Sequence, residues 1–167
     1  MNDSPATALI EVLRRHCFSV ATAESLTAGL VSATLADISG ASTVLLGGVV
    51  AYSPALKREL LGVSREVLET HGTVHAEVAR QMARGAQRRL GADLALATTG
   101  VAGPGPAEGH PPGTGFIALA LPSDETLVRP FTLTGSRNEI RAKVVDEILT
   151  WATVEIAHMW ARMSWTP

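Results

Sequence analysis

The sequence predicts an α/β fold, a single layered domain in which a central sheet of about five strands is flanked by helices. Short apolar segments alternate with amphipathic ones along the chain, an order typical of sheets whose faces are covered by helices. The 167 residues fit one compact domain. Hydrophobic residues make up 46% of the chain and charged residues 18%, which supplies a core and excludes intrinsic disorder. We therefore expect residues 1–167 to form one domain.

The N-terminal part begins with a helix, a strand and a second helix. Residues 2–4 offer N-caps for a helix that starts at Pro5 and ends near residue 15. Residues 18–23 are apolar and partly β-branched, which predicts a buried strand. A second helix is expected from Ser25 or Thr27 to residue 37.

The middle of the chain continues with a strand and three helices. Residues 44–52 are apolar without alternation, which predicts a strand covered on both faces. Ser53 and Pro54 are cap and first-turn residues for a short helix that Gly62 ends, and residues 64–71 form another short helix. In residues 74–90 the apolar positions recur every fourth residue with arginines off that stripe, as in a surface amphipathic helix.

The C-terminal part supplies the remaining strands and a long helix. Three further strands are expected at residues 94–99, 115–121 and 126–132. Ser136 and Glu139 have the spacing of a capping box, which predicts the start of the final helix. The strand order does not follow from the sequence.

Charge and cysteine content restrict the class of partner. Fourteen Lys and Arg against sixteen Asp and Glu give a formal charge of −2, and no basic stripe appears, so no nucleic-acid partner is expected. A single cysteine, Cys17, makes no internal disulfide and suits a reducing compartment. The N-terminus lacks the pattern of a signal peptide, and the longest apolar run is far short of the roughly 20 residues that cross a membrane. We therefore expect a cytoplasmic protein without a membrane partner, compatible with a homo-oligomer.

The first candidate site is the segment Ala23-Glu24-Ser25-Leu26-Thr27-Ala28-Gly29, at the junction of a strand and a helix. Free N–H groups at a helix start, joined by the Ser25 and Thr27 hydroxyls, are suited to a phosphate or carboxylate. Ordinary helix capping by the same hydroxyls is the alternative.

The second candidate site is formed by Ser42, Tyr52 and Lys57. Lys57 is one of two lysines in the chain and Tyr52 is the only tyrosine. A serine becomes a nucleophile when a base takes its proton, and a desolvated lysine with a lowered pKa is such a base. Tyr52 would relay or orient that proton. The alternative is a turn serine, a rim tyrosine and a solvated lysine.

The third candidate site follows the strand at residues 94–99. Thr98 and Thr99 end this strand, and residues 100–115 hold six of the fifteen glycines and four of the nine prolines. Long loops of this kind in compact domains usually bind a ligand, and the carboxyl ends of strands are where α/β sheets do so. A flexible surface turn is the alternative.

Several named sites are excluded. The chain lacks a phosphate loop and a dinucleotide fingerprint, which makes a nucleotide-dependent oxidoreductase a weak candidate. His71 and His75 are four residues apart, but Gly72 lies between them and no acidic residue does, so a metal site is not expected.

Taken together, the candidate segments resemble the CinA C-terminal domain family, which is also called PncC and comprises nicotinamide mononucleotide deamidases. The similarity covers about residues 20–115 in the family's order and spacing. It is carried by the segment at 23–29 together with Gly40-Ala41-Ser42, Gly48-Val49-Val50-Ala51-Tyr52-Ser53, Lys57, His71-Gly72-Thr73-Val74, Thr99-Gly100-Val101-Ala102-Gly103-Pro104 and Pro112-Gly113-Thr114.

This resemblance implies an amidohydrolase that converts nicotinamide mononucleotide to nicotinate mononucleotide and ammonia, with no cofactor. It implies Ser42 as nucleophile, Lys57 as base and Tyr52 as helper in proton handling, so we expect the Ser42 hydroxyl within or near hydrogen-bond reach of the Lys57 amine. The substrate phosphate is expected at a helix N-terminus such as the one after Glu24. The positions matched for substrate binding are Ser25, Thr27, Gly29, Thr99, Gly100, Gly103 and Gly113.

Two questions stay open at this stage. His75 stands where the family usually has a serine, which matters if that position touches the substrate. The alternative function is a non-catalytic nucleotide-binding or regulatory module connected with competence or DNA damage.

Overall fold

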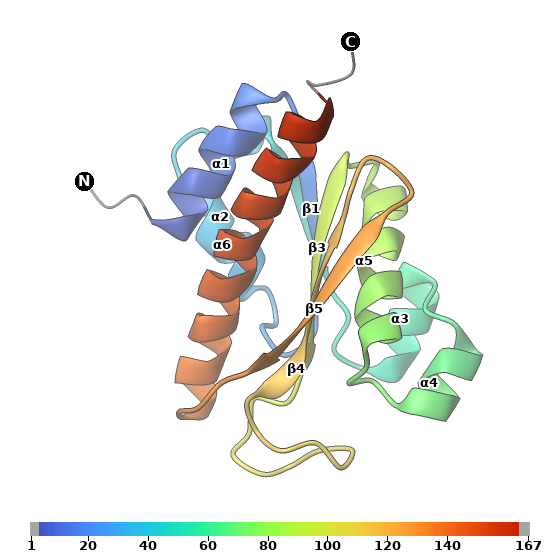
Figure 1. Cartoon of the computed structure of the whole chain (residues 1–167). Helices are drawn as coiled ribbons and strands as arrows, with labels where there is room; N and C mark the ends of the chain where they lie inside the picture. The colour runs from blue at the N-terminus through green and yellow to red at the C-terminus, as the bar shows by residue number, and fades with distance from the viewer. Residues whose placement is uncertain (1–3, 164–167) are drawn as a thin grey trace.

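A five-stranded mixed sheet forms the centre of the molecule (Figure 1). The computed structural model describes residues 4–163. The strand order is β2-β1-β3-β4-β5, with β1 parallel to β2 and β3, and with β4 antiparallel to both β3 and β5. The strands are β1 (Val20–Glu24), β2 (Leu45–Val50), β3 (Leu94–Gly100), β4 (Thr114–Ala120) and β5 (Thr126–Thr132). The predicted α/β class with five strands is thus confirmed.

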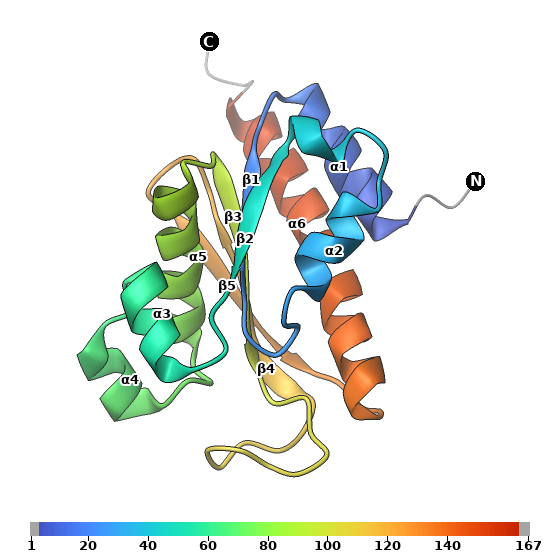
Figure 2. The same ribbon diagram turned by 180° about the vertical axis from the view of Figure 1, so that it is seen from behind.

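Helices cover both faces of this sheet (Figures 1 and 2). On one face lie α1 (Pro5–Arg15), α2 (Leu30–Ala36) and the long α6 (Arg137–Met163). On the other lie α3 (Pro54–Leu61) and α5 (Ala76–Leu90), with α4 (Arg65–His71) packed beside them. Among the described residues no helix is long and apolar enough to cross a membrane.

The two faces have cores of different composition. Toward α1 and α6 the strands present large side chains such as Leu94, Leu96 and Ile117. Toward α5 they present alanines, at positions 21, 23, 95, 97, 118 and 120. Gly85 of α5 packs directly against the backbone of Leu61 in α3, where a Cβ would collide with the Leu61 carbonyl. This close contact fixes α3, the helix that carries Lys57, against α5.

The structure differs from the sequence prediction in the burial of one strand and in the starts of two helices. Segment 44–52 was expected to be covered on both faces, but β2 is an edge strand whose residues alternate between half-buried and exposed. The second helix starts at Leu30, because Ala28 and Gly29 adopt positive φ angles of 50° and 94°. The helix predicted from residue 74 starts at Ala76, with His75 in extended conformation as its N-cap. The caps Ser4 and Ser53 and the capping box of Ser136 with Glu139 occur as predicted, whereas residues 2 and 3 lie outside the described part.

The topology brings three strand ends to one edge of the sheet. Because β2, β1 and β3 are parallel, their carboxyl ends point the same way. The segments that follow them begin at Ser25, Ala51 and Val101, and these segments meet at that edge. Ligands of open α/β sheets usually bind at such an edge.

Candidate active site

Lys57 is a buried lysine at the centre of this edge. It lies in the first turns of α3, which Ser53 caps by accepting a hydrogen bond from the Leu56 N–H. Its side chain is fully buried. The Nζ atom lies 2.9 Å from the Ser25 Oγ and donates hydrogen bonds to the carbonyl oxygens of Ala51, at 2.8 Å, and Tyr52, at 3.3 Å.

These contacts orient the amine toward Ser25. A neutral amine has two N–H donors and one lone pair, and the two carbonyls can only accept. When they take both N–H groups, the lone pair is left to accept the Ser25 O–H. Burial lowers the pKa of Lys57 to about 8, although the nearby Glu108 carboxylate acts in the opposite direction. At pH 7 about a tenth of the amine is then neutral, whereas at the ordinary pKa of 10.5 well under about a thousandth would be.

Ser25 follows β1 directly and is held by the neighbouring strand. Its N–H donates to the carbonyl of Thr98 in β3, at 3.0 Å, and its own carbonyl accepts from Ala28. The side chain is 8% exposed and lies in the wall of a cavity. A buried lysine paired with a serine whose hydroxyl reaches a cavity has the geometry of a nucleophile with its base.

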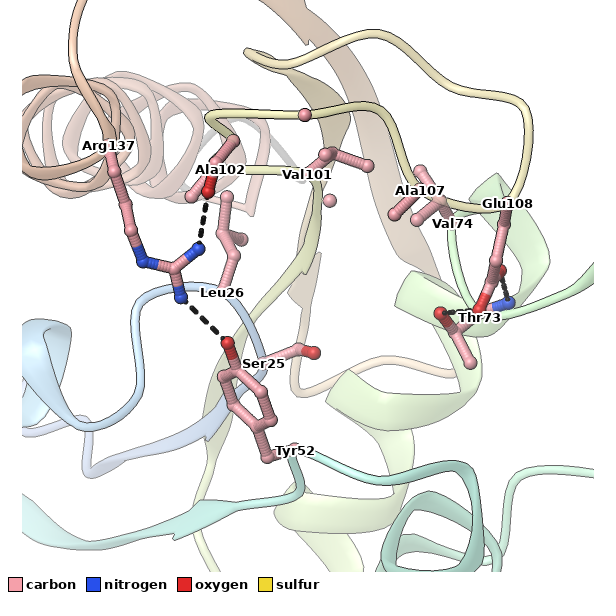
Figure 3. Close-up of a pocket in the computed structure, with 13 residues that line it drawn as sticks. Ser25, Leu26, Tyr52, Thr73, Val74, Val101, Ala102, Ala107, Glu108 and Arg137 are labelled. Atoms are coloured by element: carbon pink, nitrogen blue, oxygen red, sulfur yellow. Dashed lines mark hydrogen bonds between the residues drawn. The ribbon is translucent and has the colours of Figure 1, made fainter.

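The cavity of about 220 Å³ opens above Ser25 (Figure 3). Its walls come from the segments after β1, β2 and β3, from residues 73–74, and from the start of α6. Arg137, the first residue of α6, donates hydrogen bonds to the Tyr52 hydroxyl, at 2.9 Å, and to the Gly103 carbonyl, at 2.7 Å. One guanidinium thus joins three segments that are distant in the sequence.

Glu108 forms the wall on the other side of Ser25 from Arg137 (Figure 3). Its carboxylate accepts hydrogen bonds from the N–H and the hydroxyl of Thr73. Partial burial opposes ionisation, but the hydrogen bonds from Thr73 and from the Val74 N–H, with the charge of Lys57, outweigh it and lower the pKa of Glu108. The cavity therefore has a carboxylate on one wall and a guanidinium on the other.

The expected pairing of Ser42 with Lys57 is wrong. Ser42 is exposed and lies in a short 3₁₀ turn, Ala41–Thr43, that precedes β2, whereas Lys57 follows β2. The six residues of β2 separate the two positions by about 20 Å. The serine that contacts Lys57 is Ser25, which the sequence analysis placed among the substrate-binding residues.

Tyr52 lies at the cavity, as expected, but its phenol faces Arg137. Its contact with Lys57 is made by the backbone carbonyl. A part for the phenol in proton handling stays a prediction.

The expected substrate-binding residues fall into two groups. Ser25, Gly100 and Gly103 line the cavity. The other four, Thr27, Gly29, Thr99 and Gly113, are not among the lining residues. Thr27 is buried and bonds the Thr98 hydroxyl, and Thr99 donates to the Thr73 carbonyl. Gly29 and Gly113 have positive φ angles of 94° and 82°, and a Cβ at Gly113 would collide with the Leu133 carbonyl.

The helix N-terminus after Glu24 already has an anionic partner, which contradicts the expected phosphate site there. The buried Glu24 carboxylate accepts hydrogen bonds from the N–H groups of Gly29, Val31 and Ser32 and from the Ser32 hydroxyl, at 2.8–3.0 Å. These donors are satisfied by the protein itself.

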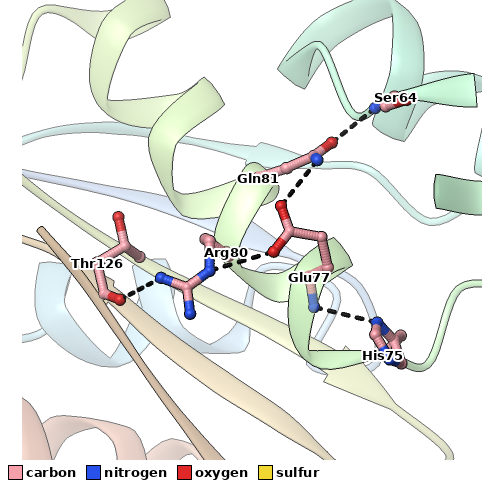
Figure 4. A network of polar contacts seen from close by, with 6 residues as sticks. All are labelled: Ser64, His75, Glu77, Arg80, Gln81 and Thr126. Atoms are coloured by element: carbon pink, nitrogen blue, oxygen red, sulfur yellow. Dashed lines mark hydrogen bonds and ion pairs between the residues drawn. The ribbon is translucent and has the colours of Figure 1, made fainter. Parts of the chain in front are cut away.

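His75 is outside the residues that line the cavity. It stacks on His71, with ring centroids 4.1 Å apart, and its Nδ1 accepts the Glu77 N–H (Figure 4). Glu77 in turn bonds Gln81 and Arg80, which fixes the first turns of α5. The histidine therefore has a structural role at a helix start. Within residues 4–163 no group of three or more His, Cys, Asp or Glu side chains is arranged to hold a metal.

Three residues of the site were missed in the sequence: Thr73, Glu108 and Arg137. Arg137 follows the capping serine of α6, and this helix starts at the edge of the sheet where the parallel strands end. Glu108 is the only carboxylate in the loop after β3. Both could have been suspected from the rule that loops at one sheet edge converge, but their pairing depends on tertiary contacts.

Comparisons with known proteins agree with this fold. Residues 2–156 match the model of the CinA C-terminal domain. A protein of Shouchella clausii named as competence-damage inducible is 49% identical over 133 residues, which cover 80% of this chain and 32% of that protein. The chain thus spans about a third of the length of the curated relatives it matches.

Solved structures of CinA-type proteins share the fold of this chain. A CinA superfamily protein from Klebsiella pneumoniae superposes with a TM-score of 0.89 at 29% identity, covering 92% of this chain and 96% of that one. A competence/damage inducible protein from Agrobacterium tumefaciens gives a TM-score of 0.82 at 34% identity, covering 94% and 99%. The chain belongs to the CinA C-terminal domain family.

Proposed function

We propose that this chain hydrolyses the carboxamide of nicotinamide mononucleotide to nicotinate mononucleotide and ammonia, with Ser25 as nucleophile and Lys57 as base. The contact of the Ser25 Oγ with the buried Lys57 Nζ, at 2.9 Å beside a cavity, carries the proposal. The resemblance to the amidohydrolase family supplies the substrate. The correction from Ser42 to Ser25 changes the nucleophile and leaves the base as expected.

The reaction proceeds by acyl transfer. Neutral Lys57 takes the Ser25 proton as the Oγ attacks the carboxamide carbon, which forms a C–O bond and a tetrahedral oxyanion. We assign the stabilisation of that charge to the backbone N–H groups of Ala102, Gly103 and Gly105, which border the cavity, because the Val101 N–H is already bonded to the Thr114 carbonyl. The C–N bond then breaks, and the ammonium form of Lys57 returns the proton to the departing amine, so that ammonia leaves. Water cleaves the acyl-enzyme by the same route.

Arg137 is the group best placed for the substrate phosphate. Its guanidinium borders the cavity and is exposed, and it has five N–H donors, of which two take part in the bonds to Tyr52 and Gly103. The hydrogen bonds to Tyr52 and Gly103 hold the Arg137 guanidinium in a fixed orientation, which lowers the entropy cost of binding an anion.

A regulatory module without turnover is the second candidate, because curated relatives are named as competence-damage inducible. Such a module would bind the mononucleotide in the same cavity. The proposal and this candidate differ in one observable, the release of ammonia.

The test is incubation of the purified chain with nicotinamide mononucleotide, with ammonia and nicotinate mononucleotide both quantified. We expect the two products in equal amounts, and loss of both with Lys57→Met. Arg129→Met, at an exposed arginine on β5 outside the cavity, is the control and is expected to keep activity. Binding of the mononucleotide with no release of ammonia would support the regulatory module instead.

A further inference from the structure

We propose that Glu108 is a specificity residue that selects amide substrates whose ring bears a positive charge. The inference rests on the proposed amidase function and deepens it. It starts from the two walls of the cavity, where a carboxylate and a guanidinium lie on opposite sides of the Ser25 hydroxyl (Figure 3).

The carboxylate of Glu108 is held in place by the protein. Thr73 donates to it through both its N–H and its hydroxyl, and Thr73 is itself fixed because its carbonyl accepts from the buried Thr99. The loop after β3 therefore carries a fixed negative charge into the cavity wall. A group held in this way loses little freedom when a ligand binds.

The charge of Glu108 is available to a ligand. In the described part of the chain Glu108 takes part in no ion pair with an arginine, lysine or histidine. Lys57 acts on it only through space, from its buried position under Ser25. A carboxylate on a cavity wall without a paired cation favours a cationic ligand, by ordinary Coulomb attraction.

The proposed substrate has the matching charge distribution. In nicotinamide mononucleotide the ring nitrogen is quaternary and positive, the carboxamide is attached to that ring, and the phosphate is negative. The ring joins the carboxamide to the ribose phosphate. With the carboxamide at Ser25 and the phosphate at Arg137, the ring therefore lies in the cavity above Ser25, between the two walls and facing the Glu108 carboxylate on one of them. A pyridinium ring there gains from Glu108, whereas the reduced dihydropyridine form, which has the same amide and phosphate, is neutral and gains nothing.

The experiment compares binding of these two ligands to Ser25→Ala, in which neither is consumed. Calorimetric dissociation constants are measured for the oxidised and the reduced mononucleotide on Ser25→Ala, with and without Glu108→Gln. We expect Glu108→Gln to weaken the cationic form about fivefold, the size of a partly screened ion pair, and to change the neutral form less than twofold. Glu66→Gln on the same background is the control, because Glu66 is exposed on α4 outside the cavity.

The dissociation constant of the reduced form divided by that of the oxidised form is the ratio that separates recognition of charge from damage to the loop. If Glu108→Gln disturbs the loop, both ligands lose affinity together and the ratio stays at its original value, which would overturn the inference. Glu108→Asp keeps the charge and is expected to keep the ratio. Absence of ammonia release by the wild type would contradict the proposed amidase. Even with that result, a lower ratio in the variant with Glu108→Gln than in the one without it would support the charge selection on its own.

Discussion

At the scale of single residues, the site depends on one amine being kept out of water. Lys57 is fully buried, and its partners are two carbonyl oxygens and the hydroxyl of Ser25. Burial disfavours the ammonium form, so the pKa of Lys57 falls to about 8. The same lysine on the surface would be almost fully protonated at neutral pH and would be a poor base.

This pKa predicts the pH dependence of turnover. In the proposed mechanism the neutral amine is the reactive form, so we expect kcat/KM for nicotinamide mononucleotide to rise about tenfold per pH unit below the pKa and to level off above about pH 8. Glu108 favours the ammonium form, so Glu108→Gln lowers the pKa of Lys57 and moves the midpoint to lower pH. Rates of ammonia release between pH 6.5 and 9.5 test this. A profile that is flat over this range, or that falls as pH rises, would contradict the role of Lys57 as base.

At the scale of elements, a buried carboxylate shapes the loop that carries Ser25. Glu24 ends β1, and its oxygens receive the N–H groups of Gly29, Val31 and Ser32. This satisfies the first donors of α2 and folds residues 25–29 back over the sheet edge. The segment therefore serves as a support for Ser25, and an external phosphate has no place at these donors.

Removal of this carboxylate is expected to destabilise the fold. Glu24→Ala leaves one buried and two half-buried N–H groups without an acceptor and costs about 3 kcal/mol in the free energy of unfolding. Glu24→Gln costs about half of that because the amide keeps one acceptor. Urea denaturation monitored by circular dichroism measures both. Glu59→Ala, at an exposed carboxylate on α3, is the control and changes stability by less than about 0.5 kcal/mol. An unchanged midpoint in Glu24→Ala would show that the carboxylate does not hold the loop.

At the scale of the whole molecule, the strand directions decide which residues meet. The three parallel strands end at one edge, so Ser25 after β1, Tyr52 after β2 and Gly103 after β3 border one cavity. A residue that precedes β2, such as Ser42, belongs to the opposite edge. Arg137 completes the site because α6 begins at the edge where the strands end (Figure 1).

The sequence predicts the elements and the loops of the site better than it predicts the pairing within the site. Residue types and spacings within a few positions of each other correctly predicted the capping box at Ser136, the short helix that carries Lys57 and the loop rich in glycine and proline. The pairing of Ser42 with Lys57, which the resemblance implied, failed because Ser42 precedes β2 and Lys57 follows it, and the strand between them separates the two residues. The edge position of β2 was missed because an apolar segment without alternation resembles a buried strand, and here Gly47 and Gly48 interrupt the pattern.

The most direct test of the account is a comparison of Ser25→Ala with Ser42→Ala in the release of ammonia from nicotinamide mononucleotide. We expect Ser25→Ala to lose at least about a thousandfold in kcat, since no nucleophile remains beside Lys57, and Ser42→Ala to keep the rate of the wild type, since this side chain is exposed at the other end of β2. Wild-type turnover by Ser25→Ala, or its loss in Ser42→Ala alone, would contradict the assignment of the nucleophile.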